Sequence, residues 1–387
     1  MAIFVINWVF GMNKKIGLLG GGQLGRMLIQ EAIDLDVEIH CLENDINAPC
    51  ANIAHGFTKG SITDKQTVLD FGAAFDLITV EIENVSIEAL YELEALGKKV
   101  YPQPSVLELI RDKGVQKEFY KTHQIPTADF QLITDSNGLQ APMEFPFVQK
   151  MRVGGYDGKG VKIIRSQMDW DKRFTAPSVI EAMIPFEKEL SVIVARNEAG
   201  AVKTFDAVEC EFNSEANLVE FQFSPAAISK EIEAKAQEIA KHVISTLDMV
   251  GLLAVEFFLT KSGELLVNEI APRPHNSGHH TIECCYTSQF AQHLRSILNL
   301  PLGNTGLIVP GAMLNILGSP GHEGPAVYEG LEDVLSLSGV YVHLYGKSHT
   351  KPFRKMGHVT LLGDDLSVIK EKAEIVKNRL MCITLES

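Results

Sequence analysis

The chain has 387 residues, of which 35 are basic and 49 acidic, so its net charge is −14. This balance argues against a protein that binds nucleic acid through bulk charge, because neutralising phosphates requires a basic surface. The length predicts about two to three domains. No apolar run reaches the roughly 18 residues of a membrane span. Six cysteines without a C-x-x-C pair favour reduced thiols and a cytoplasmic protein.

The first part of the chain alternates predicted strands and helices. Residues 1–11 are apolar but lack the features of a signal peptide, and we interpret them as an N-terminal extension or alternative start. Apolar patterns then predict strands at 15–20, 37–42, 76–80 and 99–101, and helices at 24–35 and 87–96. This alternation predicts a doubly wound parallel sheet, a Rossmann-like α/β domain, over residues 12–110.

The apolar patterns in the rest of the chain predict a mixed α+β organisation. Its expected helices cover 105–122, 229–247 and 365–379, and its expected strands cover 147–151, 161–165, 178–184, 189–196, 254–259, 264–270, 339–345 and 358–362. We place a middle domain at 111–300, with a small subdomain at about 125–190. A small β-rich C-terminal domain follows at 301–387.

The first motif is a glycine-rich turn after the first strand. Residues 20–25 satisfy G-x-G-x-x-G, and Glu43 follows about 20 residues later, as in dinucleotide-binding folds. The physical requirement is broader, because glycines let the backbone approach any anion and a helix N-terminus attracts any phosphate. A phosphate site, a dinucleotide site and a simple tight turn therefore remain open.

The second motif is the loop at 154–160, in which four of seven residues are glycine. Lys150 lies just before it on a predicted strand. Backbone N–H donors together with a lysine are typical of a flap that closes over a polyphosphate. The alternative is an ordinary hairpin tip, although such a tip needs only two or three residues of this kind.

The third motif is a pair of carboxylates, Glu256 and Glu269, on two apolar strands predicted to be neighbours. A buried carboxylate without a partner costs several kcal/mol or stays protonated, so a shared cation would stabilise both. Oxygen ligands from carboxylates and phosphates suit Mg²⁺. The alternative is that both acids face solvent.

Two further segments are rich in anion donors. Residues 271–279 contain Arg273, His275 and Asn276 between prolines, and Lys347 precedes the basic segment 354–358. The alternatives are a rigid polar loop and a solvated basic loop. The sequence contains no H-E-x-x-H and no G-x-S-x-G, which disfavours zinc-hydrolase and serine-hydrolase activities.

The order of these motifs resembles the ATP-grasp superfamily over residues 12–380. Segments 21–27, 155–160, 268–279 and 354–358 resemble the 5-(carboxyamino)imidazole ribonucleotide synthase family of purine biosynthesis. The resemblance implies an ATP-grasp fold with a Rossmann-like pre-ATP-grasp domain. It also implies a reaction: ATP phosphorylates bicarbonate, the carboxyphosphate releases CO₂, and the amine of 5-aminoimidazole ribonucleotide (AIR) captures it as a carbamate.

The resemblance further implies roles for individual residues. The ATP site would comprise Arg111, Lys150, Gly155, Tyr156, Asp157, Gly158, Lys159, Gly160, Val161, Glu181, Ala182, Met183, Ile184, Glu189, Asn268 and Glu269. Glu256 and Glu269 would bind Mg²⁺ or Mn²⁺. AIR would contact Gly22, Gln23, Leu24, Glu83, Tyr156, His275, Asn276, Lys347 and Arg354. Asp157, Arg273, Lys347 and Arg354 would be catalytic, with Asp157 orienting the amine and Arg273 stabilising carboxyphosphate.

One segment departs from the family pattern. Where the family has Glu-Asn-x-His, this chain has residues 209–212, which end in Phe212, and phenylalanine cannot donate the polar contact of a histidine. The resemblance also implies a homodimer without nucleic-acid or membrane partners. Three alternatives remain: another ATP-grasp ribonucleotide ligase such as a formate-dependent glycinamide ribonucleotide transformylase, an NAD-dependent oxidoreductase, and a non-catalytic nucleotide sensor.

Overall fold

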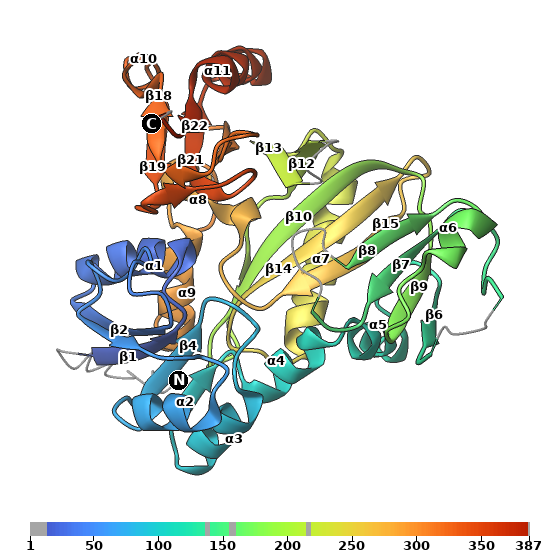
Figure 1. Cartoon of the computed structure of the whole chain (residues 1–387), viewed down its shortest axis with the longest axis horizontal. Coiled ribbons are helices and arrows are strands. Elements are labelled where there is room, and N and C mark those ends of the chain that lie inside the picture. The colour runs from blue at the N-terminus through green and yellow to red at the C-terminus, as the bar shows by residue number, and fades with distance from the viewer. Residues whose placement is uncertain (1–13, 136–139, 155–159, 214–217, 386–387) are drawn as a thin grey trace, which may run out of the picture. The chain divides into compact units, whose positions relative to one another are not determined.

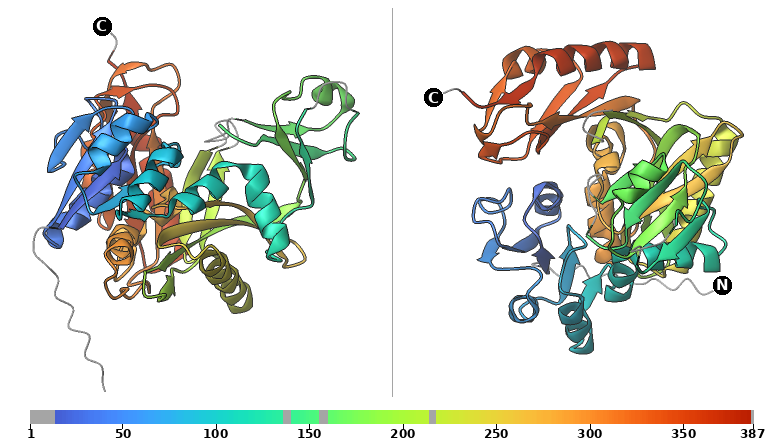
Figure 2. Two further views of the ribbon diagram at one scale, coloured as in Figure 1. Left: turned by 90° about the horizontal axis from the view of Figure 1, so that it is seen from below. Right: turned by 45° about the vertical axis from the view of Figure 1, so that its right-hand side comes forward.

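The computed structural model describes residues 14–135, 140–154, 160–213 and 218–385 (Figures 1 and 2). The segment 1–11, interpreted as an extension, lies outside them. The chain divides into two compact units, residues 1–100 and 101–387. Each unit is described by itself.

The first unit is built on a five-stranded sheet with the order β3-β2-β1-β4-β5. Strand β1 pairs in parallel with β2 and β4, and β2 pairs in parallel with β3. The strands are β1 (Lys14–Leu19), β2 (Val37–Glu43), β3 (Gly56–Lys59), β4 (Leu77–Val80) and β5 (Lys99–Tyr101); the helices are α1 (Gln23–Asp34), α2 (Lys65–Gly72) and α3 (Ile87–Ala95). The predicted doubly wound sheet is therefore confirmed. Its strand order reverses between β1 and β4, where such folds bind ligands.

The second unit contains a small antiparallel sheet with the order β6-β9-β7-β8. Its elements are β6 (Phe130–Ile133), β7 (Phe147–Met151), β8 (Val161–Ile164), α6 (Gln167–Asp171) and β9 (Ser178–Ala182). Trp170 of α6 is fully buried and meets the ring of Phe147 edge-on at 5.7 Å. This apolar core holds β7, which carries Lys150, at a defined position.

A nine-stranded sheet forms the centre of the second unit, with the order β15-β14-β10-β12-β13-β16-β21-β19 and with β11 paired to β10. The strands are β10 (Phe186–Arg196), β11 (Val202–Thr204), β12 (Val208–Asn213), β13 (Leu218–Ser224), β14 (Gly251–Thr260), β15 (Leu265–Ala271), β16 (Gly311–Leu317), β19 (Val340–Leu344) and β21 (Lys355–Leu362). Strands β10, β14 and β15 lie side by side and form its first edge (Figure 1).

Helices cover this sheet with apolar faces. The predicted amphipathic helix is α7 (Lys230–Thr246), whose Ala236, Ile239 and Val243 are buried against the β10 and β14 core. Ser229 caps it, as its side chain accepts a hydrogen bond from the Ile232 N–H at 3.3 Å. The helices α4 (Pro104–Arg111) and α5 (Lys113–Thr122) contribute Val106, Ile110 and Tyr120 to the same core. Two short helices and a longer one follow, η1 (Asn276–Gly278), α8 (Thr281–Cys284) and α9 (Gln289–Ile297).

The C-terminal strands continue the central sheet. Strand β16 pairs with β13, and α11 (Leu366–Arg379) covers β16 and β21 (Figure 2). The remaining elements are β17 (Gly324–Pro325), β18 (Val327–Glu329), α10 (Leu331–Leu335), β20 (His349–Thr350) and β22 (Met381–Ile383). Because hydrogen bonds cross the boundary predicted at residue 300, the parts 111–300 and 301–387 belong to one compact unit, and the three-domain division stays a prediction.

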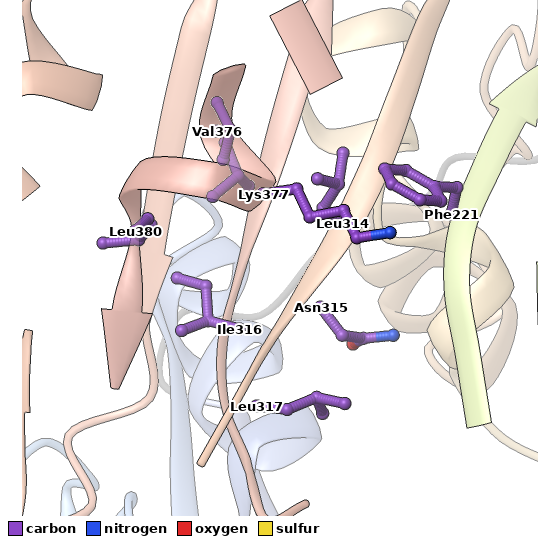
Figure 3. A pocket seen from close by; sticks show the side chains of 9 residues that line it. Phe221, Leu314, Asn315, Ile316, Leu317, Val376, Lys377 and Leu380 are labelled. Atoms are coloured by element: carbon purple, nitrogen blue, oxygen red, sulfur yellow. The ribbon is translucent and has the colours of Figure 1, made fainter. Parts of the chain in front are cut away.

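A small pocket lies between α11 and β16 in this C-terminal part. Figure 3 shows Leu314, Ile316, Val376 and Leu380 around it. Its lining is mostly aliphatic, and none of the predicted site residues contributes to it. Within the described ranges, no helix is long and apolar enough to cross a membrane.

Candidate active site

Glu256 of β14 and Glu269 of β15 lie directly opposite each other in the antiparallel register. Directly paired residues share a face of the sheet, and the two side chains are 27% and 41% exposed. A bulge follows this pair, because Phe257 is next matched to Val267 and Asn268 is the extra residue. A bulge re-aims side chains, and the Asn268 amide meets Lys150 from β7 at 2.8 Å.

The pKa values of the two carboxylates are shifted in opposite directions. Burial, followed by the charges of Glu269 and Glu189, raises the pKa of Glu256. The ammonium of Lys113, which contacts Glu269 directly, lowers the pKa of that carboxyl. Like charges on neighbouring carboxylates disfavour the ionisation of both, and a nearby cation relieves this.

Lys113 is the site residue that sequence reasoning missed. It is the first residue of α5, where Asp112 caps the helix and also forms a two-bond ion pair with Arg152. Arg111, which was predicted to bind ATP phosphates, is exposed at the end of α4. The spacing of Lys113 and Lys117 offered a signal, because residues four apart lie on one helix face.

A buried cluster of two lysines and one carboxylate lies beside the pair. Glu181 of β9 accepts from Lys150 at 3.1 Å and lies 3.5 Å from Lys117, and all three side chains are at most 10% exposed. Burial alone would raise the pKa of Glu181, but the charges of Lys150 and Lys117 hold it below its usual range. Burial lowers the pKa of Lys117 to about 8. With both lysines charged, the cluster carries a net positive charge, which suits an anionic ligand.

The residues predicted to contact the adenine and ribose of ATP lie at the end of β9 and after it. Ala182 and Ile184 are half-buried and Met183 is exposed, so this edge is open to a ligand. Glu189 on β10 is half-buried, and burial raises its pKa to about 7.

The segment that departs from the family pattern lies on β12. Glu209 forms two 2.7 Å contacts with Lys188, and Cys210 accepts from Gln222 at 3.8 Å. The side chain of Phe212 lies outside the described residues. The effect of this departure stays a prediction.

The donor-rich loop 271–279 is attached to the same sheet. His275 Nε2 lies 3.5 Å from Glu256 Oε1, and Ser277 Oγ lies 2.8 Å from Ser191 Oγ on β10. The guanidinium of Arg273 donates to the Pro274 carbonyl at 3.2 Å. Within the described part of the chain, the buried Nδ2 of Asn276 has no partner, as expected for a group that awaits a ligand.

The two cationic side chains of the C-terminal part that were predicted to bind substrate each donate a hydrogen bond to a backbone carbonyl. Lys347 Nζ donates to the Lys355 carbonyl at 2.7 Å, and Arg354 donates to the His349 carbonyl at 2.7 Å. Both side chains are half-buried rather than freely solvated. Their predicted contacts with substrate stay predictions.

The glycine turn of the first unit is occupied by two carboxylates of the chain itself. Glu81, just after β4, accepts hydrogen bonds from the N–H groups of Gly22 and Gly25, the latter at 2.6 Å. Glu43 accepts from Gly21, Asn44 and Asp45, so its carboxylate is folded onto its own loop. This arrangement disfavours Glu43 as the acidic ribose ligand of a dinucleotide site.

The other predicted residues of this unit lie at the same edge of its sheet. Gln23 and Leu24 begin α1 and are half-buried, as is Glu83 beyond β4. The first N–H groups of a helix have no partner within it, so they can receive an anion.

The structure describes only the ends of the glycine-rich loop 154–160. Gly155, Tyr156, Asp157, Gly158 and Lys159 lie outside the described residues. Gly160 and Val161 are described, and the Gly160 carbonyl accepts from the Met151 N–H at 2.8 Å, closing the hairpin of β7 and β8. Gly160 has a φ of +78°, which favours glycine there.

Four histidines near the donor-rich loop are buried and neutral. Burial lowers the pKa of His280 and of His293 to about 4, and it lowers those of His279 and His358 well below the usual value. In the unfolded chain the same side chains have a pKa of about 6.5. The unfolded state therefore binds more protons between these values, and stability is lost as the pH falls below 6.5.

We expect lowering the pH from 7.5 to 5.5 to reduce the free energy of unfolding by about 1.4 kcal/mol for each of His280 and His293. Urea unfolding at pH 7.5, 6.5 and 5.5 measures this. His293→Leu should make the decrease smaller by one histidine's share. A pH-independent unfolding free energy, or an unchanged decrease in the variant, would contradict it.

Family models and known proteins match this chain over most of its length. Three family models match in chain order: the ribonucleotide synthetase preATP-grasp domain at 12–111, the ATP-grasp domain at 118–290 and the phosphoribosylaminoimidazole carboxylase C-terminal domain at 311–372. The N5-carboxyaminoimidazole ribonucleotide synthase of Bacillus subtilis is 36% identical over 356 residues, covering 90% of this chain and 91% of that protein. The chain belongs to the N5-carboxyaminoimidazole ribonucleotide synthase family.

Solved structures of the N5-carboxyaminoimidazole ribonucleotide synthase family agree with this fold. The synthetase of Thermotoga maritima matches with a TM-score of 0.89 and 40% identity over 96% of this chain and 100% of that one. The Aspergillus clavatus synthase, solved with ADP and AIR, matches with a TM-score of 0.86 and 31% identity over 95% and 98%. The predicted ATP-grasp fold is confirmed. The chain spans 66% of the phosphoribosylaminoimidazole carboxylase of Vigna aconitifolia, which is therefore a longer protein.

Proposed function

We propose that this chain is the ATP-dependent ligase that carboxylates AIR to N5-carboxyaminoimidazole ribonucleotide in purine biosynthesis. ATP and bicarbonate give ADP and carboxyphosphate, which breaks down to CO₂ and phosphate. The amine of AIR then attacks CO₂ and loses a proton to give the carbamate. One observation carries the proposal: Glu256 and Glu269 face each other with Lys113 in contact and with Lys150 held beside them through Asn268.

The carboxylate pair fits a divalent cation. Within the described ranges, no group of three or more histidine, cysteine, aspartate or glutamate side chains forms a metal site. Mg²⁺ is usually held by one or two carboxylates together with substrate phosphates, so Glu256 and Glu269 would suffice once ATP is bound. Bound there, Mg²⁺ or Mn²⁺ would neutralise charge on the transferring phosphoryl group.

The surrounding residues would orient the nucleotide. Lys113 and Lys150 would contact the phosphates, with the flap 155–161 above, and residues 181–184 would contact the adenine edge. Glu189 would accept from the ribose. A positive charge placed where negative charge develops accelerates phosphoryl transfer, and Arg273 is proposed to act on carboxyphosphate in this way.

The residues proposed to bind AIR are those that the family resemblance implies. In the first unit, the N–H groups of Gln23 and Leu24 would receive its phosphate and Glu83 its ribose. In the second, His275, Asn276, Lys347 and Arg354 would bind AIR and bicarbonate, with Tyr156 and Asp157 at the amine. We also propose a cytoplasmic homodimer, with small molecules as its other partners.

A direct assay tests the proposal. Purified protein with ATP, Mg²⁺, bicarbonate and AIR should form ADP and phosphate only when AIR is present. Activity with glycinamide ribonucleotide and formate instead would identify a transformylase. Quenching of tryptophan fluorescence by NADH but not by ATP would favour an oxidoreductase. No AIR-dependent ADP formation would refute the proposed function.

A further inference from the structure

A row of three imidazoles in contact joins two distant parts of the second unit. The rings of His343 on β19 and His358 on β21 are stacked, with centroids 4.4 Å apart and an interplanar angle of 8°. His279, which follows η1, adds a third ring at 4.7 Å from His358. His279 and His358 are at most 1% exposed. The row therefore packs the donor-rich loop against the strand pair that leads to Lys347.

Polar contacts continue from the middle ring of this row, His358, towards Lys347. The hydroxyl of Tyr345 lies 3.0 Å from His358 Nδ1, within the buried interior. The ammonium of Lys347 lies over the Tyr345 ring, 5.6 Å from its centroid. At the outer ring, His343 Nε2 contacts Glu283 of α8 at 2.7 Å.

At the other end, Gln289 connects the row to His275. Its amide nitrogen donates to the His275 carbonyl at 2.8 Å and to His279 Nδ1 at 3.0 Å, and its oxygen accepts from the His275 N–H at 2.8 Å. Both the nitrogen and the oxygen of the Gln289 amide are therefore hydrogen-bonded, which fixes this amide in one orientation. A Cβ at Gly278 would lie 2.4 Å from the Gln289 oxygen, so the loop approaches as closely as glycine permits.

The row is more polar than packing alone requires. Neutral imidazoles in a dry interior each need partners for two ring nitrogens. In the described part of the chain, His358 Nε2 and Glu283 Oε2 are buried without a partner. Apolar side chains of similar shape would fill the same space without this cost, so a purely structural role leaves these polar groups unexplained.

We propose that the row His279–His358–His343, joined to Tyr345 at its middle ring and to Gln289 at its His279 end, is a positioning element that fixes His275 and Lys347 relative to each other. The contacts through Gln289 and through Tyr345 lead to residues proposed above to bind AIR and bicarbonate, so the proposal rests on that function. None of the row residues is assigned contact with substrate. Losing the polar link should loosen the AIR side and leave ATP binding as it was.

Two variants that keep the rings test this. Tyr345→Phe removes one hydroxyl, and His358→Phe keeps a flat ring without nitrogens. We expect each to lower kcat/KM for AIR about tenfold, the equivalent of about 1.4 kcal/mol, while the KM for ATP stays within about twofold. Tyr328→Phe is the matched control, because its hydroxyl donates to a backbone carbonyl of the same strand β21, at 3.3 Å.

The possible results distinguish a failure of the positioning role from a failure of the proposed function. Wild-type kinetics in Tyr345→Phe, or equal losses for ATP and AIR, would overturn the positioning role. A comparable loss in Tyr328→Phe would also overturn it, because any change near β21 would then suffice. If His358→Phe fails to fold, Tyr345→Phe decides. A wild-type protein without AIR-dependent turnover refutes the proposed function, and the positioning role with it.

Discussion

Glu269→Gln is expected to reduce AIR-dependent ATP consumption by about a hundredfold or more while the fold is retained. The substitution removes the charge that faces both Glu256 and Lys113 and that would bind the cation. Removing one electrostatic group from such a site commonly costs this much in rate. The protein should remain folded, because the amide of glutamine has nearly the shape of the carboxylate and can accept a hydrogen bond from Lys113, whose side chain is 20% exposed.

Steady-state ADP formation and thermal unfolding measure the two parts of this prediction. Glu264→Gln is the matched control, because Glu264 lies at the turn of the same hairpin and is exposed. It should retain activity. Full activity in Glu269→Gln would show that the carboxylate does not serve the reaction. Loss of the folded state would show that its role is structural.

Lys113→Met is expected to reduce turnover more than Arg111→Met does. The Lys113 ammonium already lies at Glu269, whereas Arg111 is exposed at the end of α4. Replacing Lys113 removes a charge from the phosphate side and leaves Glu269 without its contact, so we expect about a fiftyfold loss or more in kcat/KM for ATP.

Initial rates at varied ATP concentration measure this difference. Lys121→Met is the control on the same helix, because Lys121 is exposed in its last turn, and it should retain activity. A larger loss in Arg111→Met than in Lys113→Met would support the prediction made from the sequence. Equal and small losses in both variants would show that the residues of α4 and α5 do not contribute to the ATP site.

Much of the site could be predicted because its signals are short-range. The apolar run before Gly20, the helix after Ser229 and the two acids in apolar strands are local patterns, and the structure confirms these elements. Glu256 and Glu269 were expected on neighbouring strands because a short turn at Ser262 and Gly263 separates them. Short connections make antiparallel neighbours, so the pairing followed from sequence spacing.

Other features depend on contacts between residues far apart in the chain. Lys113 meets Glu269 across 156 positions, and Gln289 binds His275, 14 residues before it. Strand β16 pairs with β13, about 90 residues earlier in the chain. No local pattern encodes such pairings, because each is decided by which surfaces are buried together when the chain folds.

The sequence by itself determined the order of the motifs, the two α/β and α+β parts and the pairing of Glu256 with Glu269, the carboxylates proposed to bind a metal. Only the tertiary structure decided which lysine faces them, which carboxylates occupy the glycine turn and how the histidine row is built. Periodicity and turn chemistry act over a few residues, whereas ion pairs and buried polar contacts depend on the packing of the whole unit.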